Sequence, residues 1–228
     1  MNNTKNTQIN IYFCDVSPLE DEILYSEYYS KCSNGRKEKT DRLRLKKDKQ
    51  LSVGAEYILR YACKDFGIDF YKQNILYGEK SKPYFENCDI NYNISHSGNF
   101  AMCIMSYSEV GCDIEKRAVY NLDTAQRFFH KNETEMLCEC KTDEEMSTLF
   151  CKIWTLKESY IKCCGKGLSM PLNSFSVVEN HHLKHTDKSF YLYENKLNSD
   201  YQYAFCINCE NFTDIKDISI QTKTVSFC

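Results

Sequence analysis

The stretch Phe150-Cys-Lys-Ile-Trp-Thr-Leu-Lys-Glu-Ser-Tyr-Ile-Lys-Cys-Cys-Gly-Lys-Gly-Leu168 carries apolar side chains at the three- and four-residue spacing of a helix. The apolar positions are Phe150, Ile153, Trp154, Tyr160, Ile161 and Cys164. This spacing predicts an amphipathic helix that packs against a core, and Gly165 marks the place where the helix ends. Lys157 falls in the middle of the apolar face, where charged residues are rare.

Two more charged residues, Glu158 and Lys162, lie at the edge of this face, one helical turn apart. At this spacing a carboxylate and an ammonium group can converge on one ligand. For an arbitrary Glu/Lys pair, a solvated salt bridge is the ordinary interpretation. The single Trp of the chain, the lysine inside the apolar face and the Gly-Lys-Gly exit at 165–167 favour a functional site instead.

The composition is that of a soluble globular protein, because 42% of the 228 residues are apolar and 27% are charged. The net charge of −3 offers no global attraction to nucleic acid or to an anionic membrane. The first residues are polar and lack the apolar segment of a signal peptide, and no stretch has the length of a membrane span. We therefore expect a cytoplasmic protein.

The chain contains 14 cysteines. Without a secretion signal, we interpret them as reduced thiols used as small apolar residues. A structural zinc site is the alternative, since two closely spaced cysteine pairs and three histidines could supply ligands. These residues are Cys138, Cys140, Cys206, Cys209, His181, His182 and His185.

Residues 36–49 contain eight basic side chains and three acidic ones, and we predict one strongly basic helix here. The ordinary interpretation is a solvated face, and the functional one is a phosphate-binding surface. Nucleic acid is the rival ligand, but interleaved aromatic residues and a nucleic-acid-binding motif are missing. Around this stretch we predict a strand at 9–16, a helix at 19–29 and a second helix at 52–66.

Further along the chain, extended segments lead into two polar turns. Pro83 disfavours helix at Lys82, so this lysine is presented on a loop after the strand that begins at Ile75. A strand at 90–94 runs into the turn Ser95-His96-Ser97-Gly98, where hydroxyls, an imidazole and backbone N–H groups can meet one anion. For a lone histidine, a surface position without function is the more common outcome.

Two acidic residues follow in a predicted hairpin of strands 100–105 and 110–115. Asp113 and Glu115 share one face of the second strand, because side chains alternate along a strand. Paired carboxylates repel each other unless a cation lies between them, and oxygen ligands of this kind suit Mg²⁺. A solvated edge strand with two surface acids is the competing interpretation.

In chain order, five segments form a pattern that resembles the Sfp-type 4'-phosphopantetheinyl transferases, which activate carrier proteins of peptide, polyketide and related synthases. The segments are Ser95-His96-Ser97-Gly98, Gly111-Cys112-Asp113-Ile114-Glu115-Lys116, Arg127-Phe128-Phe129, Trp154-Thr155-Leu156-Lys157-Glu158-Ser159-Tyr160-Ile161-Lys162 and Gly165-Lys166-Gly167-Leu168. The resemblance covers about residues 36–177, and several motifs in the right order are more specific than any one alone.

The resemblance implies an α+β fold of two similar subdomains related by pseudo-twofold symmetry, with coenzyme A and Mg²⁺ in the cleft between them. In this chain the subdomains would be residues 1–109 and 110–228. By the same resemblance, Asp113, Glu115 and Glu158 would hold the metal. The coenzyme A phosphates would contact Arg36, Lys39, Ser52, Lys82, Ser95, His96 and Lys162.

The family implies transfer of 4'-phosphopantetheine from coenzyme A to a serine of an apo-carrier protein, by a monomer that acts on peptidyl, polyketide or acyl carriers. Lys162 and His96 would neutralise the leaving adenosine 3',5'-bisphosphate, and Glu158 is the candidate base. One departure is Leu51, where the family often has a basic residue; Lys49 or Arg44 could replace it. The alternatives are a non-catalytic carrier- or nucleotide-binding protein and, within the enzymes, service to fatty-acid synthase. We expect carrier selectivity to reside in surface loops such as 129–146.

Overall fold

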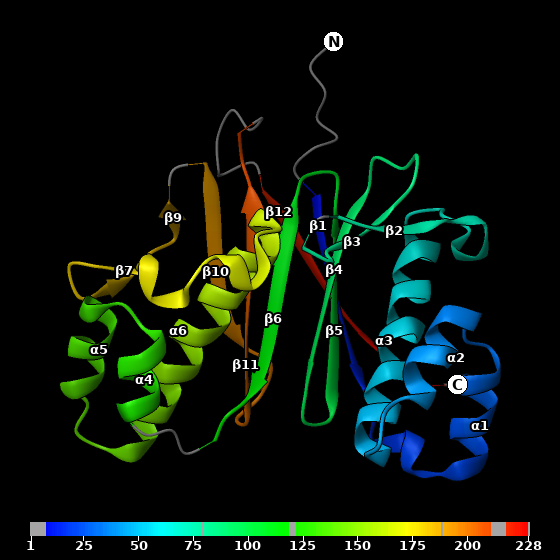
Figure 1. The fold of residues 1–228 in the computed structure, drawn as a ribbon, viewed down its shortest axis with the longest axis horizontal. Coiled ribbons are helices and arrows are strands. Elements are labelled where there is room, and N and C mark those ends of the chain that lie inside the picture. Colours follow the sequence, from blue (N-terminus) through cyan, green and yellow to red (C-terminus); the bar gives the residue numbers. More distant parts are fainter. Residues whose placement is uncertain (1–7, 79, 119–121, 188, 211–217, 228) are drawn as a thin grey trace.

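The computed structural model describes residues 8–78, 80–118, 122–187, 189–210 and 218–227. These residues form two four-stranded β-sheets that stand side by side at the centre of the molecule, with helices on the outer side of each (Figure 1). The arrangement confirms the predicted α+β class.

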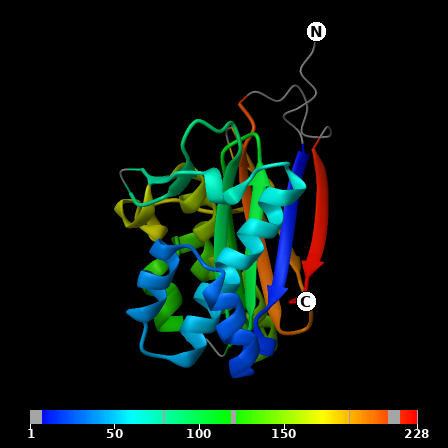
Figure 2. The same ribbon diagram turned by 90° about the vertical axis from the view of Figure 1, so that its right-hand side faces the viewer.

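The first sheet has the strand order β12-β1-β5-β4. Its strands are β1 (Gln8–Asp15), β4 (Asn91–Ser97), β5 (Phe100–Ser106) and β12 (Ser219–Val225). β1 confirms the strand predicted at 9–16, and it pairs antiparallel with β5 and parallel with β12. The last strand of the chain therefore lies beside the first one, as the red and blue arrows in Figure 2 show.

Three helices cover the outer side of this sheet: α1 (Glu22–Ser30), α2 (Asn34–Asp41) and α3 (Lys46–Asp65). The prediction of one basic helix at 36–49 was wrong, because α2 ends at Asp41 and α3 begins at Lys46. The chain turns here so that α2 can pack on α3, where the buried Thr40 and Ser52 hydroxyls lie 2.7 Å apart. α3 also begins before the predicted 52, because its polar first turn carries no apolar periodicity, although Asp48 suits a helix N-terminus.

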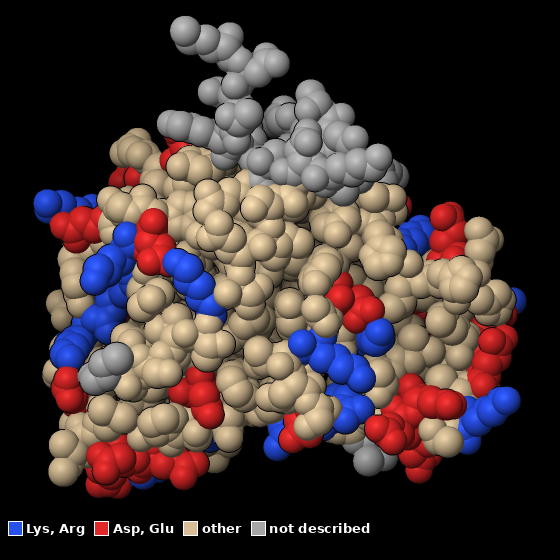
Figure 3. All heavy atoms as spheres, turned by 180° about the vertical axis from the view of Figure 1, so that it is seen from behind, with Lys and Arg blue, Asp and Glu red and all other residues tan. Residues whose placement is uncertain are grey.

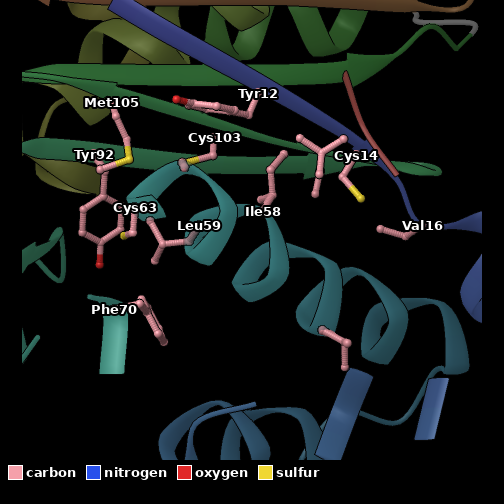
Figure 4. Close-up of a cluster of buried hydrophobic side chains, with 14 of the residues drawn as sticks. Tyr12, Cys14, Val16, Ile58, Leu59, Cys63, Phe70, Tyr92, Cys103 and Met105 are labelled. Atoms are coloured by element: carbon pink, nitrogen blue, oxygen red, sulfur yellow. The ribbon is translucent and has the colours of Figure 1, made fainter. Parts of the chain in front are cut away.

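The core of this half fills the space between α3 and the sheet (Figure 4). Ile58 lies on the side of α3 that faces the sheet, and Leu59 and Cys63 lie near Tyr92 of β4; all four are at most 2% exposed. Shorter elements complete the half: the 3₁₀ turns Ser17–Glu20 and Phe70–Lys72, and a two-stranded sheet of β2 (Ile75–Tyr77) and β3 (Pro83–Phe85). The predicted strand, turn and second extended segment after Ile75 are confirmed.

The second sheet has the order β6-β11-β10-β9 and is covered by the long helix α6. Its strands are β6 (Val110–Lys116), β9 (Thr186–Asp187), β10 (Phe190–Lys196) and β11 (Tyr201–Asn208). The helices of this half are α4 (Leu122–Phe128), α5 (Lys131–Cys138) and α6 (Asp143–Cys164). Two 3₁₀ turns (Gly167–Ser169 and Leu172–Ser174) and the strand pair β7 (Val178–Glu179) and β8 (His182–Leu183) follow α6.

Helix α6 confirms the central prediction of the sequence analysis. Residues 150–164 of the quoted stretch form all of α6 after its first seven residues, Lys157 is fully buried, and Gly165 ends the helix with a φ of 63°, a conformation that favours glycine. The surface loop expected at 129–146 was wrong, because α5 and the first turn of α6 occupy most of it. A cap at His130, whose imidazole accepts the Asn132 N–H, together with Glu133 explains why a helix begins there.

The predicted hairpin of strands 100–105 and 110–115 was wrong in its pairing. β5 has both edges occupied by β1 and β4, so β6 instead pairs with β11 in the second sheet. The faces of the two sheets that point away from the helices form a shared core, in which the Phe13 and Tyr203 rings lie 4.9 Å apart. The boundary between subdomains 1–109 and 110–228 stays a prediction, with β6 beginning at Val110 and β12 returning to the first sheet.

Two surface properties follow. Among the described residues, no helix combines the length and apolar character needed to cross a membrane. On the face opposite to the view of Figure 1, basic and acidic side chains lie in small groups near each other, and the central area carries neither (Figure 3).

Candidate functional site

The predicted acidic pair lies where the two sheets meet, with β4 beside β6. Asp113 is 3% exposed, and its Oδ1 accepts a hydrogen bond of 2.7 Å from the Ser95 hydroxyl. Two residues further along both strands, Glu115 Oε2 accepts one of 2.7 Å from Ser97. Alternating serines on β4 thus match alternating acids on β6, because the side-chain period of both strands is two.

Helix α6 places the other two predicted residues against the same acids. Lys162 Nζ lies 2.6 Å from Asp113 Oδ1 and 3.3 Å from the Ser95 hydroxyl. The helix approaches this closely because of Gly111 on β6: a Cβ there would lie 2.2 Å from the Ser159 carbonyl oxygen. A glycine at this position is therefore a condition for the site.

Negative charge accumulates at this point. Asp113 Oδ2 is buried and has no hydrogen-bond partner among the residues that the structure describes. Burial, and next the Asp113 charge, raise the pKa of Glu115 to about 7. Burial also raises the pKa of Glu158, with Asp113 adding to the rise while Lys162 opposes it. A cation between these carboxylates would relieve both the repulsion and the unpaired oxygen.

Lys162 remains a charged group in this position. Burial by itself would lower the pKa of Lys162. The Asp113 carboxylate and several smaller contributions act in the opposite direction and together outweigh burial, so that the pKa is raised. Its ammonium group therefore compensates part of the acidic charge and leaves Asp113 Oδ2 unpaired.

A second group of predicted residues gathers around His96, on the other face of β4. Loss of hydration and the nearby charges of Lys162, Lys39 and Arg36 lower the pKa of His96, although its side chain is exposed. Arg36 is held by the buried Glu56, whose Oε2 lies 3.6 Å from its Nε. Cations from α2 and α6 thus act on one imidazole, and such a convergence of positive charge suits phosphate groups.

Two predicted phosphate ligands have other neighbours. Ser52 is 4% exposed and its hydroxyl lies beside that of Thr40. Lys82 Nζ contacts Glu109 Oε2 at 2.5 Å and the Cys163 carbonyl oxygen at 3.1 Å, at the end of α6. Their roles stay predictions.

The suggested replacements for Leu51 lie elsewhere. Leu51 itself is 6% exposed, in the core beneath α3. Arg44 and Lys49 line a separate pocket of about 360 Å³ with Glu22. The largest charge effects on His96 come instead from Lys162, Lys39 and Arg36.

A pocket of about 460 Å³ opens beside Glu158 and Lys162, and the sequence analysis missed it. Its lining includes Ile161 of α6 and Phe128 of α4, together with Gly167 and residues 170–173 after α6. The sequence analysis also left Ser97 out of the site, although the spacing Ser95-x-Ser97 repeats that of Asp113-x-Glu115 and could have indicated the pairing.

No complete metal site stands preformed: among the described residues, no three His, Cys, Asp or Glu side chains lie close enough to hold a metal ion. This applies equally to the cysteines and histidines of the zinc alternative. The donor chemistry of the acids nevertheless fits Mg²⁺, because carboxylate oxygens are its usual protein ligands and Asp113 Oδ2 is unpaired.

Comparisons with known proteins point in one direction. A model of the 4'-phosphopantetheinyl transferase superfamily matches residues 109–208. The chain is 34% identical to 4'-phosphopantetheinyl transferase gsp of Aneurinibacillus migulanus, over 76% of this chain and 74% of that protein. It is 36% identical to 4'-phosphopantetheinyl transferase Sfp of Bacillus subtilis (strain 168), over 66% of this chain and 67% of that protein.

One solved structure overlaps in part. The holo-[acyl-carrier-protein] synthase of Thermotoga maritima matches with a TM-score of 0.35 and 18% identity, over 44% of this chain and 62% of that one. A score this low carries no argument about the present chain.

Proposed function

Because this chain belongs to the 4'-phosphopantetheinyl transferase superfamily, we infer that it transfers the 4'-phosphopantetheine group of coenzyme A to a serine of an apo-carrier protein. The observation that supports this most directly is Asp113, a buried carboxylate with one oxygen held by Lys162 and the other unpaired. A non-catalytic carrier- or nucleotide-binding protein would have no use for three acids around one lysine.

We propose that Mg²⁺ binds between Asp113, Glu115 and Glu158. The unpaired Asp113 oxygen and the raised pKa values of both glutamates support this assignment. When bound, the ion would offset negative charge on the pyrophosphate of coenzyme A. Ser95 and Ser97 would hold Asp113 and Glu115 in place through the hydrogen bonds described above.

In the proposed reaction, the serine oxygen of the carrier attacks the β-phosphorus of coenzyme A. A new phosphorus–oxygen bond forms, the bond to the leaving adenosine 3',5'-bisphosphate breaks, and the serine proton passes to a base. Glu158 is our candidate for that base, acting directly or through a water molecule, because it lies beside Lys162 and Asp113 at the site where the leaving group would be neutralised. Lys162 would neutralise the charge that accumulates on the leaving group.

The cations on the other face of β4 would hold the nucleotide end. Arg36, Lys39 and His96 act on one another electrostatically, and their convergence supports a role in binding the phosphates of coenzyme A. His96 carries less charge than an ordinary histidine at neutral pH, since its pKa is lowered. A bound phosphate would favour its protonated form and strengthen the contact.

Intact-mass spectrometry of carrier proteins tests the proposal. Apo-carriers of the peptidyl, polyketide and acyl types are mixed with the protein, coenzyme A and either Mg²⁺ or a chelator. We expect one phosphopantetheine per carrier domain with Mg²⁺ and a large loss of rate with the chelator. No mass gain on any carrier, with the protein shown to be folded, would contradict the function; full activity with the chelator would contradict only the metal. The panel of carriers also tests which carrier class the protein prefers. Sedimentation of the same sample tests the proposal that the protein is a monomer. We also propose that the protein is located in the cytoplasm.

A further inference from the structure

Lys157 makes a set of contacts that the proposed reaction does not use. Its side chain and that of Glu133 are both 0% exposed, and Nζ lies 2.8 Å from Glu133 Oε2. The same Nζ donates to the carbonyl oxygens of Leu172 at 2.8 Å and Phe175 at 2.6 Å. All three donors of the ammonium group are therefore used.

Glu133 is equally saturated. Its Oε1 accepts the Val177 N–H at 2.7 Å, and its Oε2 also accepts the His130 N–H at 2.8 Å. The pair thus joins three parts of the chain: the start of α5, the middle of α6 and the segment 172–177. A buried ion pair is costly to form, because both groups lose their hydration, so stability alone is a weak reason for its presence.

The location of the pair links it to the pocket beside the site. Residues 170–173 line that pocket together with Glu158, and Lys157 directly precedes Glu158 on α6. One helical turn therefore carries both the proposed base and the anchor of a segment that lines the same pocket. Nζ also lies 4.3 Å from the centre of the Phe175 ring, which adds a further contact to the same segment.

We propose that Lys157 is a positioning residue: paired with Glu133, it fixes the segment 170–175, whose residues 170–173 line the pocket, at a set distance from Glu158 and so orients the carrier segment that presents the serine. The inference rests on the proposed function, because it assigns this pocket to the carrier. Coenzyme A would keep most of its affinity without Lys157, since three of its proposed phosphate ligands, Arg36, Lys39 and His96, belong to α2 and β4 and not to the segments that Lys157 anchors.

The test substitutes Lys157→Met, which keeps the length of the side chain and removes the charge. We expect kcat/KM for the carrier to fall about 10- to 100-fold, through a higher KM, because a displaced pocket lining holds the carrier segment less well. The affinity for coenzyme A, measured by calorimetry, should be largely unchanged. Amide hydrogen exchange should accelerate in residues 170–177 and remain as before in the first sheet.

Ile58→Ala serves as the matched control, because it removes a fully buried side chain from the core of the other half. It should lower the stability without changing the carrier KM or the exchange at 170–177. If Lys157→Met does not fold, Phe175→Leu weakens the same anchor while leaving the backbone acceptors, and a smaller rise of the carrier KM is expected.

An unchanged carrier KM in a folded Lys157→Met protein, or a rise in the coenzyme A KM alone, would overturn the positioning role. A uniform acceleration of exchange across both halves would do the same, since it would show a purely global effect. The failure of the proposed function has a different signature, because the unmodified protein would then transfer nothing to any carrier.

Discussion

Helix α6 carries two lysine–carboxylate pairs that differ in how completely they are satisfied. In the Lys157–Glu133 pair, every ammonium donor and both carboxylate oxygens have partners, and neither side chain is exposed. In the Lys162–Asp113 pair, the lysine side chain is 28% exposed and Asp113 Oδ2 has no partner among the described residues. The closed pair has nothing left to bind a ligand, whereas the open pair has an unpaired oxygen and a reachable cation.

The largest expected loss of stability follows the removal of one member of the closed Lys157–Glu133 pair. Lys157→Met should lower the free energy of unfolding by about 3–5 kcal/mol, because it leaves an uncompensated buried carboxylate. Lys162→Met should cost less stability, since Asp113 keeps the Ser95 hydrogen bond and gains access to water. Urea titrations followed by the fluorescence of Trp154, which packs on Phe150 of α6, measure both. An equal loss in the two variants would show that the pairs do not differ.

For catalytic activity we expect the opposite order, with the larger loss at the open Lys162–Asp113 pair and its neighbouring acids. Asp113→Ala and Glu158→Ala should each reduce kcat by about 100-fold or more, the usual loss for a group that stabilises transition-state charge. Glu115→Ala should be milder, because water can replace one ligand of Mg²⁺. Initial rates at low Mg²⁺, with the exposed Asp123→Ala as control, check this. A near-normal rate for Asp113→Ala would contradict the assignment of these acids as metal ligands.

The charges around His96 extend the contrast, because Lys39, like Lys162, has an ammonium group that a ligand can reach. Hydrogen bonds to charged groups are worth roughly 1.5–3 kcal/mol, so dephospho-coenzyme A should be used about 10- to 150-fold less well than coenzyme A. The absence of a basic residue at Leu51 favours the lower end. Lys39→Ala should remove much of this discrimination, whereas Lys37→Ala on the same helix, whose Nζ instead contacts the Ser30 carbonyl oxygen, should preserve it. If the unmodified protein used both substrates equally well, the basic side chains of α2 would be interpreted as a solvated face without a role in phosphate binding.

The smallest expected effect concerns pH. The folded-state pKa of Glu115 is raised to about 7, above its unfolded value, so folding favours the protonated form. Metal-free protein should therefore lose stability as the pH rises from the unfolded pKa through 7, by about 1 kcal/mol once partial solvent access is considered. Urea midpoints between pH 5 and 8 measure the slope, which both Glu115→Gln and Mg²⁺ should reduce, while Glu158 keeps a contribution of the same sign. The same slope in Glu115→Gln would assign it to another group.

Part of this site could be predicted from local sequence. The apolar spacing in 150–164 and Gly165 determine where α6 runs and ends, and the same spacing shows that Lys157 is buried. The alternation at Asp113 and Glu115 places both carboxylates on one face of a strand. These features depend only on the helical and strand periods, which neighbouring residues encode.

The tertiary structure decided which residues meet. Nothing near Lys157 in sequence identifies Glu133 or the carbonyl oxygens of 172–175 as its partners, and the pairing of β6 with β11 replaced the expected hairpin. The break between α2 and α3 likewise follows from packing, because the basic stretch 36–49 has helical propensity throughout. Whether an ion pair is closed or open depends on groups supplied by distant segments, and these are brought together only when the two sheets and their helices pack.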